Sequence, residues 1–206
     1  MTIGGVTLRM NESWEAGIGG GLWTTGKALA CYFRDNKKEL EKILRNKSAI
    51  ELGSGNAFIG MLLSVIVPSA KVFVTDIGEH VQFMEDTLQL NRDQLDFDRI
   101  SVAEYNWGDA VVPARLGGHS KFDFIFGSDV AYRDYLHSPL VEALKLLSHQ
   151  GTKILIGVTM HDTSVSFFDK LIENGFRYTR LHDSVMDEEF HGKMSGLFFI
   201  ERWPKS

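Results

Sequence analysis

The sequence of 206 residues predicts one α/β domain in which helices cover both faces of a mostly parallel sheet. Short runs rich in β-branched and aromatic residues alternate with segments of helical periodicity. These helical segments are long enough for right-handed crossovers, which join parallel strands of one sheet. The sequence has no internal repeat, low-complexity block or Pro/Ser-rich linker. We therefore expect residues 1–206 to form a single domain.

The expected elements follow this alternation along the chain. Seven strands are predicted, at Ala49–Leu52, Lys71–Asp76, Ile100–Tyr105, Phe122–Gly127, Lys153–Val158, Phe176–His182 and Gly196–Trp203. Helices are predicted at Ala57–Val67, Glu79–Asn91, His137–Ser148 and Ser164–Asn174. No helical pattern joins the last two strands, so the last strand is expected to run antiparallel. The prediction is a Rossmann-like, doubly wound, seven-stranded sheet.

An N-terminal extension of about 45 residues precedes the first strand of this sheet. Val6–Met10, followed by Trp14, is predicted to form a hairpin, and Ile18–Trp23 is too rich in glycine for a regular element. One long or broken helix is expected over Thr24–Arg45, with Thr24 or Thr25 as its N-cap.

Composition excludes several classes of function. The formal net charge is -5 and the sequence has no polybasic run, so we expect neither nucleic-acid nor membrane-surface binding. Cys31 is the single cysteine, and the sequence lacks Cys/His spacing for a zinc site, so no metal is expected. The sequence has neither a secretory start nor a membrane-spanning apolar run. These features fit a cytoplasmic protein, which we expect to be a monomer.

A glycine turn, Glu51-Leu-Gly-Ser-Gly55, follows the first predicted strand of the sheet. Ligands of such sheets bind beyond the carboxyl ends of the strands, and Gly53 and Gly55 would let the backbone approach one closely. A dinucleotide fingerprint needs a third glycine where this chain has Phe58. The residues after Gly55 also lack the Gly-Lys-Ser/Thr element that binds nucleotide triphosphates. A tight strand-to-helix turn without a ligand is the alternative.

An acidic residue, Asp76, ends the next strand, at the place where a carboxylate accepts hydrogen bonds from both ribose hydroxyls. S-adenosyl-L-methionine carries a ribose, an ammonium group and a sulfonium but no phosphate, so acceptors and carboxylates suit it. Glu51 is a candidate to meet the amino acid end of that ligand. The sequence therefore predicts S-adenosyl-L-methionine as the cofactor.

Almost the whole chain resembles the seven-strand protein lysine methyltransferases of the METTL21 type, also called methyltransferase family 16. The motifs that carry the resemblance are Gly20-Gly-Leu-Trp23, Glu51–Gly55, Thr75-Asp76, Leu90-Asn91, Asn106-Trp107-Gly108 and Phe122–Tyr132. Asp129-Val-Ala-Tyr132 matches the family's Asp-x-x-Tyr signature. The glycine turns of the family commonly have a third glycine, where this chain has Ala57. The resemblance implies a class I SAM-dependent methyltransferase domain.

The resemblance also implies roles for individual residues. Asp129 is expected to accept a hydrogen bond from the incoming lysine amine and orient it, and Tyr132 with Trp23 would wall the lysine channel. The cofactor contacts that we expect are Trp23, Glu51, Gly53, Ser54, Gly55, Asp76, Ile77, Asn106, Trp107 and Ser128. Two alternatives stay open. In one, Asp129 is the N-cap of a short turn and Tyr132 is a packing residue; in the other, Trp107 is a core residue at the sheet edge. None of the seven histidines is assigned a catalytic role.

The function expected from these features is protein-lysine N-methylation of a folded protein such as an elongation factor or a chaperone. Its partner would be the protein substrate that presents the lysine. A small-molecule N-methyltransferase is one alternative, because fold and cofactor do not fix the acceptor. A non-catalytic SAM-binding partner protein is another. The acidic stretch Asp183–Phe190 is either a solvated loop or a docking surface for a basic substrate.

Overall fold

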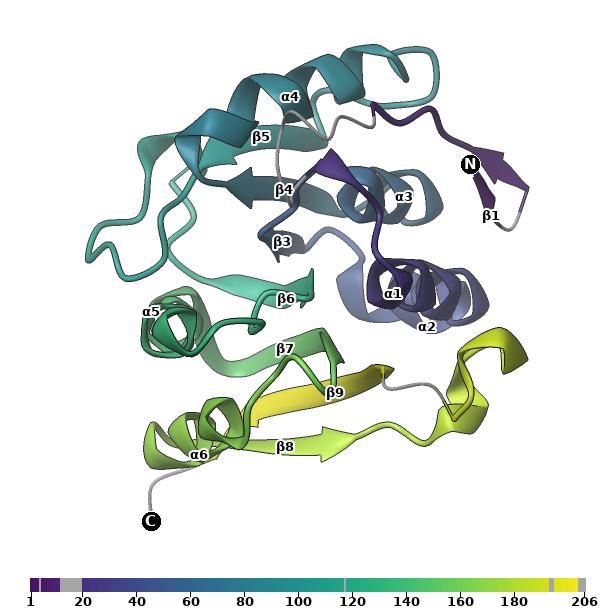
Figure 1. The fold of residues 1–206 in the computed structure, drawn as a ribbon. Helices are drawn as coiled ribbons and strands as arrows, with labels where there is room; N and C mark the ends of the chain where they lie inside the picture. The colour runs from purple at the N-terminus through teal and green to yellow at the C-terminus, as the bar shows by residue number, and fades with distance from the viewer. Residues whose placement is uncertain (4, 12–19, 117, 193–194, 204–206) are drawn as a thin grey trace.

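The computed structural model describes residues 1–3, 5–11, 20–116, 118–192 and 195–203. Its main sheet has seven strands in the order β5-β4-β3-β6-β7-β9-β8 (Figure 1). The strands are β3 (Ser48–Leu52), β4 (Lys71–Asp76), β5 (Ile100–Glu104), β6 (Phe122–Ser128), β7 (Ser148–Thr159), β8 (Phe176–Arg180) and β9 (Ser195–Arg202). The last strand, β9, is antiparallel to both β7 and β8, whereas β3 to β7 pair in parallel. The predicted α/β fold is confirmed.

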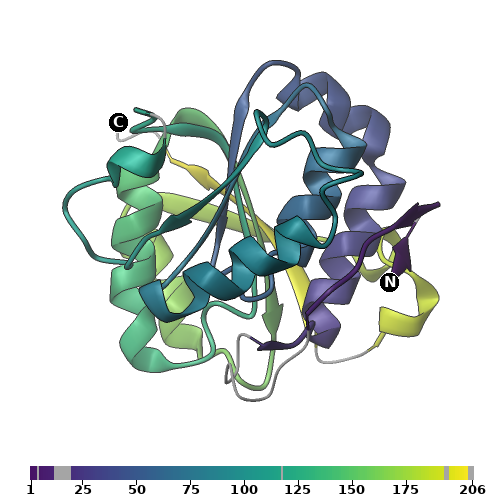
Figure 2. The same ribbon diagram turned by 90° about the horizontal axis from the view of Figure 1, so that it is seen from above.

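Helices cover the two faces of the sheet (Figure 2). They are α1 (Thr24–Asp35), α2 (Lys37–Leu44), α3 (Phe58–Ile66), α4 (Gly78–Gln89), α5 (Asp134–Leu147) and α6 (Val165–Glu173). One apolar cluster joins α1 to α4 with one face of the sheet, and a second joins α5 and α6 with the other. Phe33 of α1 illustrates the packing, because its buried ring lies 5.3 Å from that of Phe126 in β6. Burying a side chain of this size contributes roughly 2–3 kcal/mol.

Short elements complete the described chain. They are a two-stranded sheet of β1 (Thr2–Ile3) and β2 (Val6–Thr7), and the 3-10 helices η2 (Ala114–Leu116), η3 (Asp183–Val185) and η4 (Glu188–Phe190). The predicted hairpin at Val6–Met10 is therefore wrong in its bounds, since Val6 pairs back with Ile3. Trp14 lies outside the described residues.

The predicted N-terminal helix is broken at Asn36, which ends α1 and begins α2. Its side-chain amide donates to Tyr32 O at 3.0 Å, which satisfies one of the carbonyls left over at the end of α1. The prediction of Thr24 or Thr25 as N-cap is wrong, because Trp23 occupies that position and both threonines lie in the first turn. This shift places Thr25 against the sheet, where it is fully buried.

Two elements begin earlier in the structure than the sequence predicted. Helix α5 begins at Asp134, about one turn before His137, and contains Pro139. Strand β7 begins at Ser148, where Ser148 pairs with Phe122, so it runs longer than the apolar run Lys153–Val158. These differences do not change where the parallel strands end. Their carboxyl ends meet at one edge of the sheet, as expected for β3, β4, β5, β6 and β7. No helix in the described ranges is long and apolar enough to cross a membrane.

Candidate active site

A cleft of about 1020 Å³ lies at the carboxyl edge of the parallel strands. Its size is at the upper end of the range of small-molecule sites. Its walls include every predicted site residue except Glu51, namely Trp23, Gly53, Ser54, Gly55, Asp76, Ile77, Asn106, Trp107, Ser128, Asp129 and Tyr132. These residues come from the last positions of β4 and β6, from the segments that follow β3, β4, β5 and β6, and from the segment before α1. The predicted cofactor and acceptor residues thus share one cavity.

The glycine turn requires glycine for both conformation and space. Gly53 and Gly55 have φ of 63° and 55°, in the left-handed region that favours glycine. A Cβ atom on Gly53 would come within 2.8 Å of Val130 Cγ1 and 3.2 Å of Trp107 Cζ2. Trp107 is half-buried: it packs against the apolar cluster and also lines the cleft, so its predicted contact with adenine stays a prediction.

Ala57 occupies the position of the third family glycine and keeps a left-handed conformation, with φ 61° and ψ 10°. An L-residue in this region costs roughly 1–2 kcal/mol. Its methyl group is fully buried in the apolar cluster, which offsets part of that cost. Asn56 Oδ1 accepts from Phe58 N–H at 3.2 Å and thereby caps the first turn of α3.

Asp76 ties the glycine turn to the start of α4. Its Oδ2 accepts from Gly55 N–H at 2.8 Å, and its Oδ1 accepts from Ile77 N–H at 2.8 Å. His80 Nδ1 lies 2.9 Å from the same Oδ1, one helical turn further along α4. A carboxylate has about four acceptor sites, so these three contacts leave about one, on Oδ2, for a ribose hydroxyl. His80 was not predicted as a site residue, although its i,i+4 spacing from Asp76 could have indicated a contact between the two side chains.

Glu51 lies beneath the glycine turn and is not part of the cleft wall. It is 1% exposed, and its Oε2 accepts from Gly60 N–H of α3 at 2.9 Å. Burial raises the pKa of this carboxyl to about 8, against the hydrogen bonds of Ser54 and Gly60 that lower it. In this structure Glu51 therefore links β3 to α3, and its predicted contact with the amino acid end of a ligand stays a prediction.

Replacing Glu51 with glutamine should remove a pH dependence of stability. The folded parent holds a proton that the unfolded chain, with an ordinary pKa of 4.5, has already lost, so its free energy of unfolding falls as pH rises from 4.5 to about 8. Glutamine keeps an acceptor for Gly60 N–H and does not titrate. Between these pH values, we expect the free energy of unfolding of Glu51→Gln to rise relative to that of the parent by about 1.4 kcal/mol per pH unit.

Urea denaturation at a series of pH values measures this difference. Glu173→Gln, at the exposed end of α6, is the matched control and should follow the parent at every pH. Parallel curves for Glu51→Gln and the parent would contradict the buried, proton-binding role of Glu51.

Asp129 follows β6 in a left-handed conformation with φ 53°. Its N–H donates to Gly157 O at 2.8 Å, and its Oδ1 accepts from the Thr159 hydroxyl at 2.8 Å. Burial raises the pKa of this carboxyl, against the hydrogen bonds from Thr159 and Thr25. The N-cap of α5 is Arg133, so Asp129 does not cap that helix. Strain at a polar residue inside a cleft is typical of functional sites.

Tyr132 lies on the same cleft wall, three residues after Asp129. It is half-buried, and the guanidinium of Arg133 lies 5.8 Å from its ring centroid. Desolvation raises the pKa of its hydroxyl. Other residues that line the cleft were not predicted, because no local sequence motif marks them: Thr159, Tyr105, Tyr135, His161 and Asp162.

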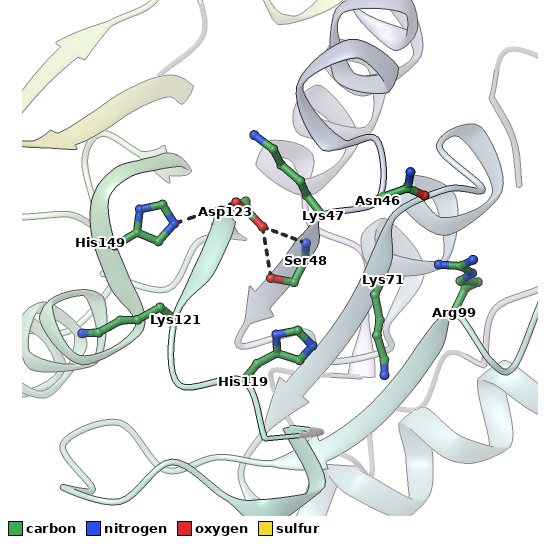
Figure 3. Close-up of a pocket in the computed structure, with 9 residues that line it drawn as sticks. All are labelled: Asn46, Lys47, Ser48, Lys71, Arg99, His119, Lys121, Asp123 and His149. Carbon is green, nitrogen blue, oxygen red and sulfur yellow. Dashed lines mark hydrogen bonds and ion pairs between the residues drawn. The ribbon is translucent and has the colours of Figure 1, made fainter.

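A second, smaller pocket of about 360 Å³ lies at the opposite edge, around the amino ends of β3, β4 and β6 (Figure 3). Its cationic side chains point in different directions; they are Lys47, Lys71, Arg99 and Lys121. Its carboxylate Asp123 accepts from Ser48 N–H at 3.0 Å and lies 3.8 Å from His149. These side chains do not converge on one point, so the large cleft remains the candidate site. In the described part of the chain no group of three His, Cys, Asp or Glu side chains could hold a metal.

The fold and the cleft together define an α/β methyltransferase. The family model described as lysine methyltransferase matches residues 4–174, which is most of the chain. This protein therefore belongs to the lysine methyltransferase family.

Curated relatives agree with this assignment. The protein N-lysine methyltransferase METTL21A of Xenopus tropicalis is 25% identical over 194 residues, covering 93% of this chain and 77% of that protein. The protein N-terminal and lysine N-methyltransferase efm7 of Aspergillus fumigatus is 25% identical over 180 residues, covering 81% and 68%. The EEF1A lysine methyltransferase 3 of Xenopus tropicalis is 22% identical over 191 residues, covering 91% and 80%.

Solved structures show the same fold at low sequence identity. A precorrin-6y C5,15-methyltransferase from Geobacter metallireducens superposes with a TM-score of 0.58 at 13% identity, covering 89% of this chain and 91% of that one. Human N-acetylserotonin methyltransferase, solved in complex with SAM, superposes with a TM-score of 0.56 at 15% identity. The match covers 86% of this chain and 55% of that larger one.

Proposed function

We propose that this chain is an S-adenosyl-L-methionine-dependent protein-lysine N-methyltransferase that acts on a folded protein in the cytoplasm. One observation carries the proposal: the Gly53–Gly55 turn and the Asp129–Tyr132 segment, far apart in sequence, line one cleft. Names of relatives support a protein acceptor, since one is an EEF1A lysine methyltransferase and several are protein N-lysine methyltransferases. An elongation factor or a chaperone is the proposed class of substrate.

The described residues fit the cofactor. Gly53 lets the turn approach a ligand closely, and acceptors such as Asp76 and Asn106 suit a ribose and an adenine. In the described part of the chain, Tyr105 Oη is the one buried side-chain polar atom that has no hydrogen-bond partner, and Tyr105 lines the cleft. Trp107 offers a flat face to a ring. When bound, the cofactor supplies an electrophilic methyl group on its sulfonium.

The hydroxyl of Tyr105 should have opposite effects on stability and on cofactor binding. Its ring is 1% exposed, and a buried hydroxyl without a partner costs about 1–3 kcal/mol. Tyr105→Phe should therefore stabilise the free protein by about 1 kcal/mol. If the hydroxyl receives its partner from the cofactor, the same change should weaken cofactor binding by about tenfold.

Urea denaturation of the free protein and calorimetric titration with S-adenosylhomocysteine measure these two effects. Tyr178→Phe, on the exposed face of β8 away from the cleft, is the control and should change neither. Unchanged affinity in Tyr105→Phe would remove this hydroxyl from the cofactor site.

The site residues would align the acceptor rather than deprotonate it. The carboxylate of Asp129 accepts a hydrogen bond from the amine and orients its lone pair, but a carboxylate also stabilises the ammonium form. Loss of the ammonium proton is instead favoured by desolvation between Trp23 and Tyr132, because an apolar wall disfavours the charged amine. Holding the amine in line is the larger part of such catalysis.

Asp129→Ala should lose methyl transfer while it keeps cofactor binding. Removing a hydrogen bond to a charged group costs about 1.5–3 kcal/mol, which corresponds to a loss of roughly tenfold to a hundredfold in kcat/KM. Transfer of label from cofactor to proteins of a cell lysate gives the activity, and calorimetry gives the affinity. Asp169→Ala, exposed on α6, is the control.

The component of the lysate that takes up the label distinguishes the proposed function from its two alternatives. One labelled protein band supports the proposal, and label confined to small molecules would instead indicate a small-molecule N-methyltransferase. Cofactor binding without transfer would indicate a non-catalytic binding protein. Normal transfer by Asp129→Ala would contradict the role of Asp129.

A further inference from the structure

We propose that Thr159 and Thr25 form a hydrogen-bonded clamp that positions the carboxylate of Asp129 for the acceptor amine. The inference rests on the proposed function, because it takes Asp129 as the residue that orients the amine. Together with Ser195, which contacts Thr25, these two residues form the hydroxyl clamp. None of these three was predicted as a site residue, although Thr25 was a candidate N-cap.

The first part of the clamp is the attachment of Asp129 to β7. The N–H of Asp129 donates to Gly157 O at 2.8 Å, and Thr159, two residues further along the same strand, donates to Asp129 Oδ1 at 2.8 Å. Backbone and side chain of Asp129 are thus both held by the end of one strand. This double attachment supports the left-handed φ of 53°, which an isolated residue adopts at a cost.

The second part is the support of Thr159 from two other elements. Thr25 Oγ1, in the first turn of α1, lies 3.1 Å from Thr159 Oγ1 and 3.3 Å from Ser195 Oγ at the start of β9. Thr25 is 0% exposed and Ser195 is 5% exposed, so water does not compete for these hydroxyls. The hydroxyl of Thr159 is thus packed between the carboxylate of Asp129 and the buried hydroxyl of Thr25, which in turn contacts Ser195.

Gly157 allows the helix to come close enough for these contacts. A Cβ atom on Gly157 would lie 2.7 Å from Thr25 Cγ2, which is closer than carbon atoms pack. Without a side chain at this position, α1 lies against the end of β7 and Thr25 reaches Thr159. The clamp therefore depends on a close approach of helix and strand that the sequence provides with one glycine.

The direction of the clamp follows from its chemistry. An ionised carboxylate accepts but does not donate, so the single proton of the Thr159 hydroxyl goes to Asp129. Thr159 engages Oδ1, and the carboxylate has further acceptor capacity for an amine. A donor fixed on one oxygen restricts rotation of the carboxylate, and such restriction is the role of a positioning residue.

Thr159→Val, which keeps the shape and removes the hydroxyl, tests the clamp. We expect kcat with the protein acceptor to fall by about tenfold and the affinity for S-adenosylhomocysteine to change by less than about twofold. Thr159→Ser restores the hydroxyl and should recover most of kcat. Thr25→Val, one step further from Asp129, should show a smaller loss of the same kind.

Thr152→Val is the matched control on the same strand. Its buried hydroxyl donates to Phe122 O at the opposite edge of the sheet, so this variant loses a comparable hydrogen bond far from the cleft. We expect it to lose stability, measured by urea denaturation, and to keep kcat.

The outcomes separate this inference from the proposed function. If Asp129→Ala is inactive but Thr159→Val retains parental kcat, the clamp is overturned and the function stands. If Thr159→Val and Thr152→Val lose activity in proportion to stability, the hydroxyls are only structural and the clamp is again overturned. If Asp129→Ala is fully active, Asp129 does not orient the amine, and both its proposed role and the clamp are overturned.

Discussion

The position of β3 between β4 and β6 is the constraint on which the site depends. Strand β3 pairs in parallel with both neighbours, and the chain leaves it first toward β4 and later returns to β6 on its other side. The connections at the carboxyl ends therefore diverge, and a crevice opens at this switch point. Gly53 and Asp129 lie on its two sides, although they are distant in sequence. A ligand in the crevice and an acceptor beside Asp129 are brought together by strand order alone.

Three carboxyl groups near this crevice avoid mutual repulsion through different surroundings. Glu51 is fully buried, and desolvation raises its pKa to about 8, so it holds its proton at neutral pH. Asp76 accepts two backbone N–H groups and a contact from His80. Hydrogen bonds from the hydroxyls of Thr159 and Thr25 to Asp129 offset part of the rise in its pKa that burial causes. Since Asp76 itself raises the pKa of Glu51, a neutral Glu51 removes one charge from beneath the turn.

Sequence patterns predicted those parts of the structure that depend on neighbouring residues. The alternation of strands and helices, the Gly53–Gly55 turn and the acidic end of β4 are local features, and the cleft contains nearly all residues expected from them. The burial of Glu51 was not predicted, because it depends on the approach of Gly60 from α3. Contacts such as Thr25 with Thr159 join segments whose pairing only the folded chain defines. Local propensity also does not specify the break at Asn36, where tertiary packing sets the helix ends.

The N-terminal extension is part of the site rather than an addition to it. Residues Gly21–Trp23 line the cleft, and α1 packs against β7 and β9 with Thr25 buried between them. The same helix inserts Phe33 into the core against β6, so its position is fixed by a large apolar contact well away from the cleft. The packing of α1 therefore positions two residues of the site: Trp23, which lines the cleft, and Thr25, which is buried and contacts the Thr159 hydroxyl that donates to Asp129.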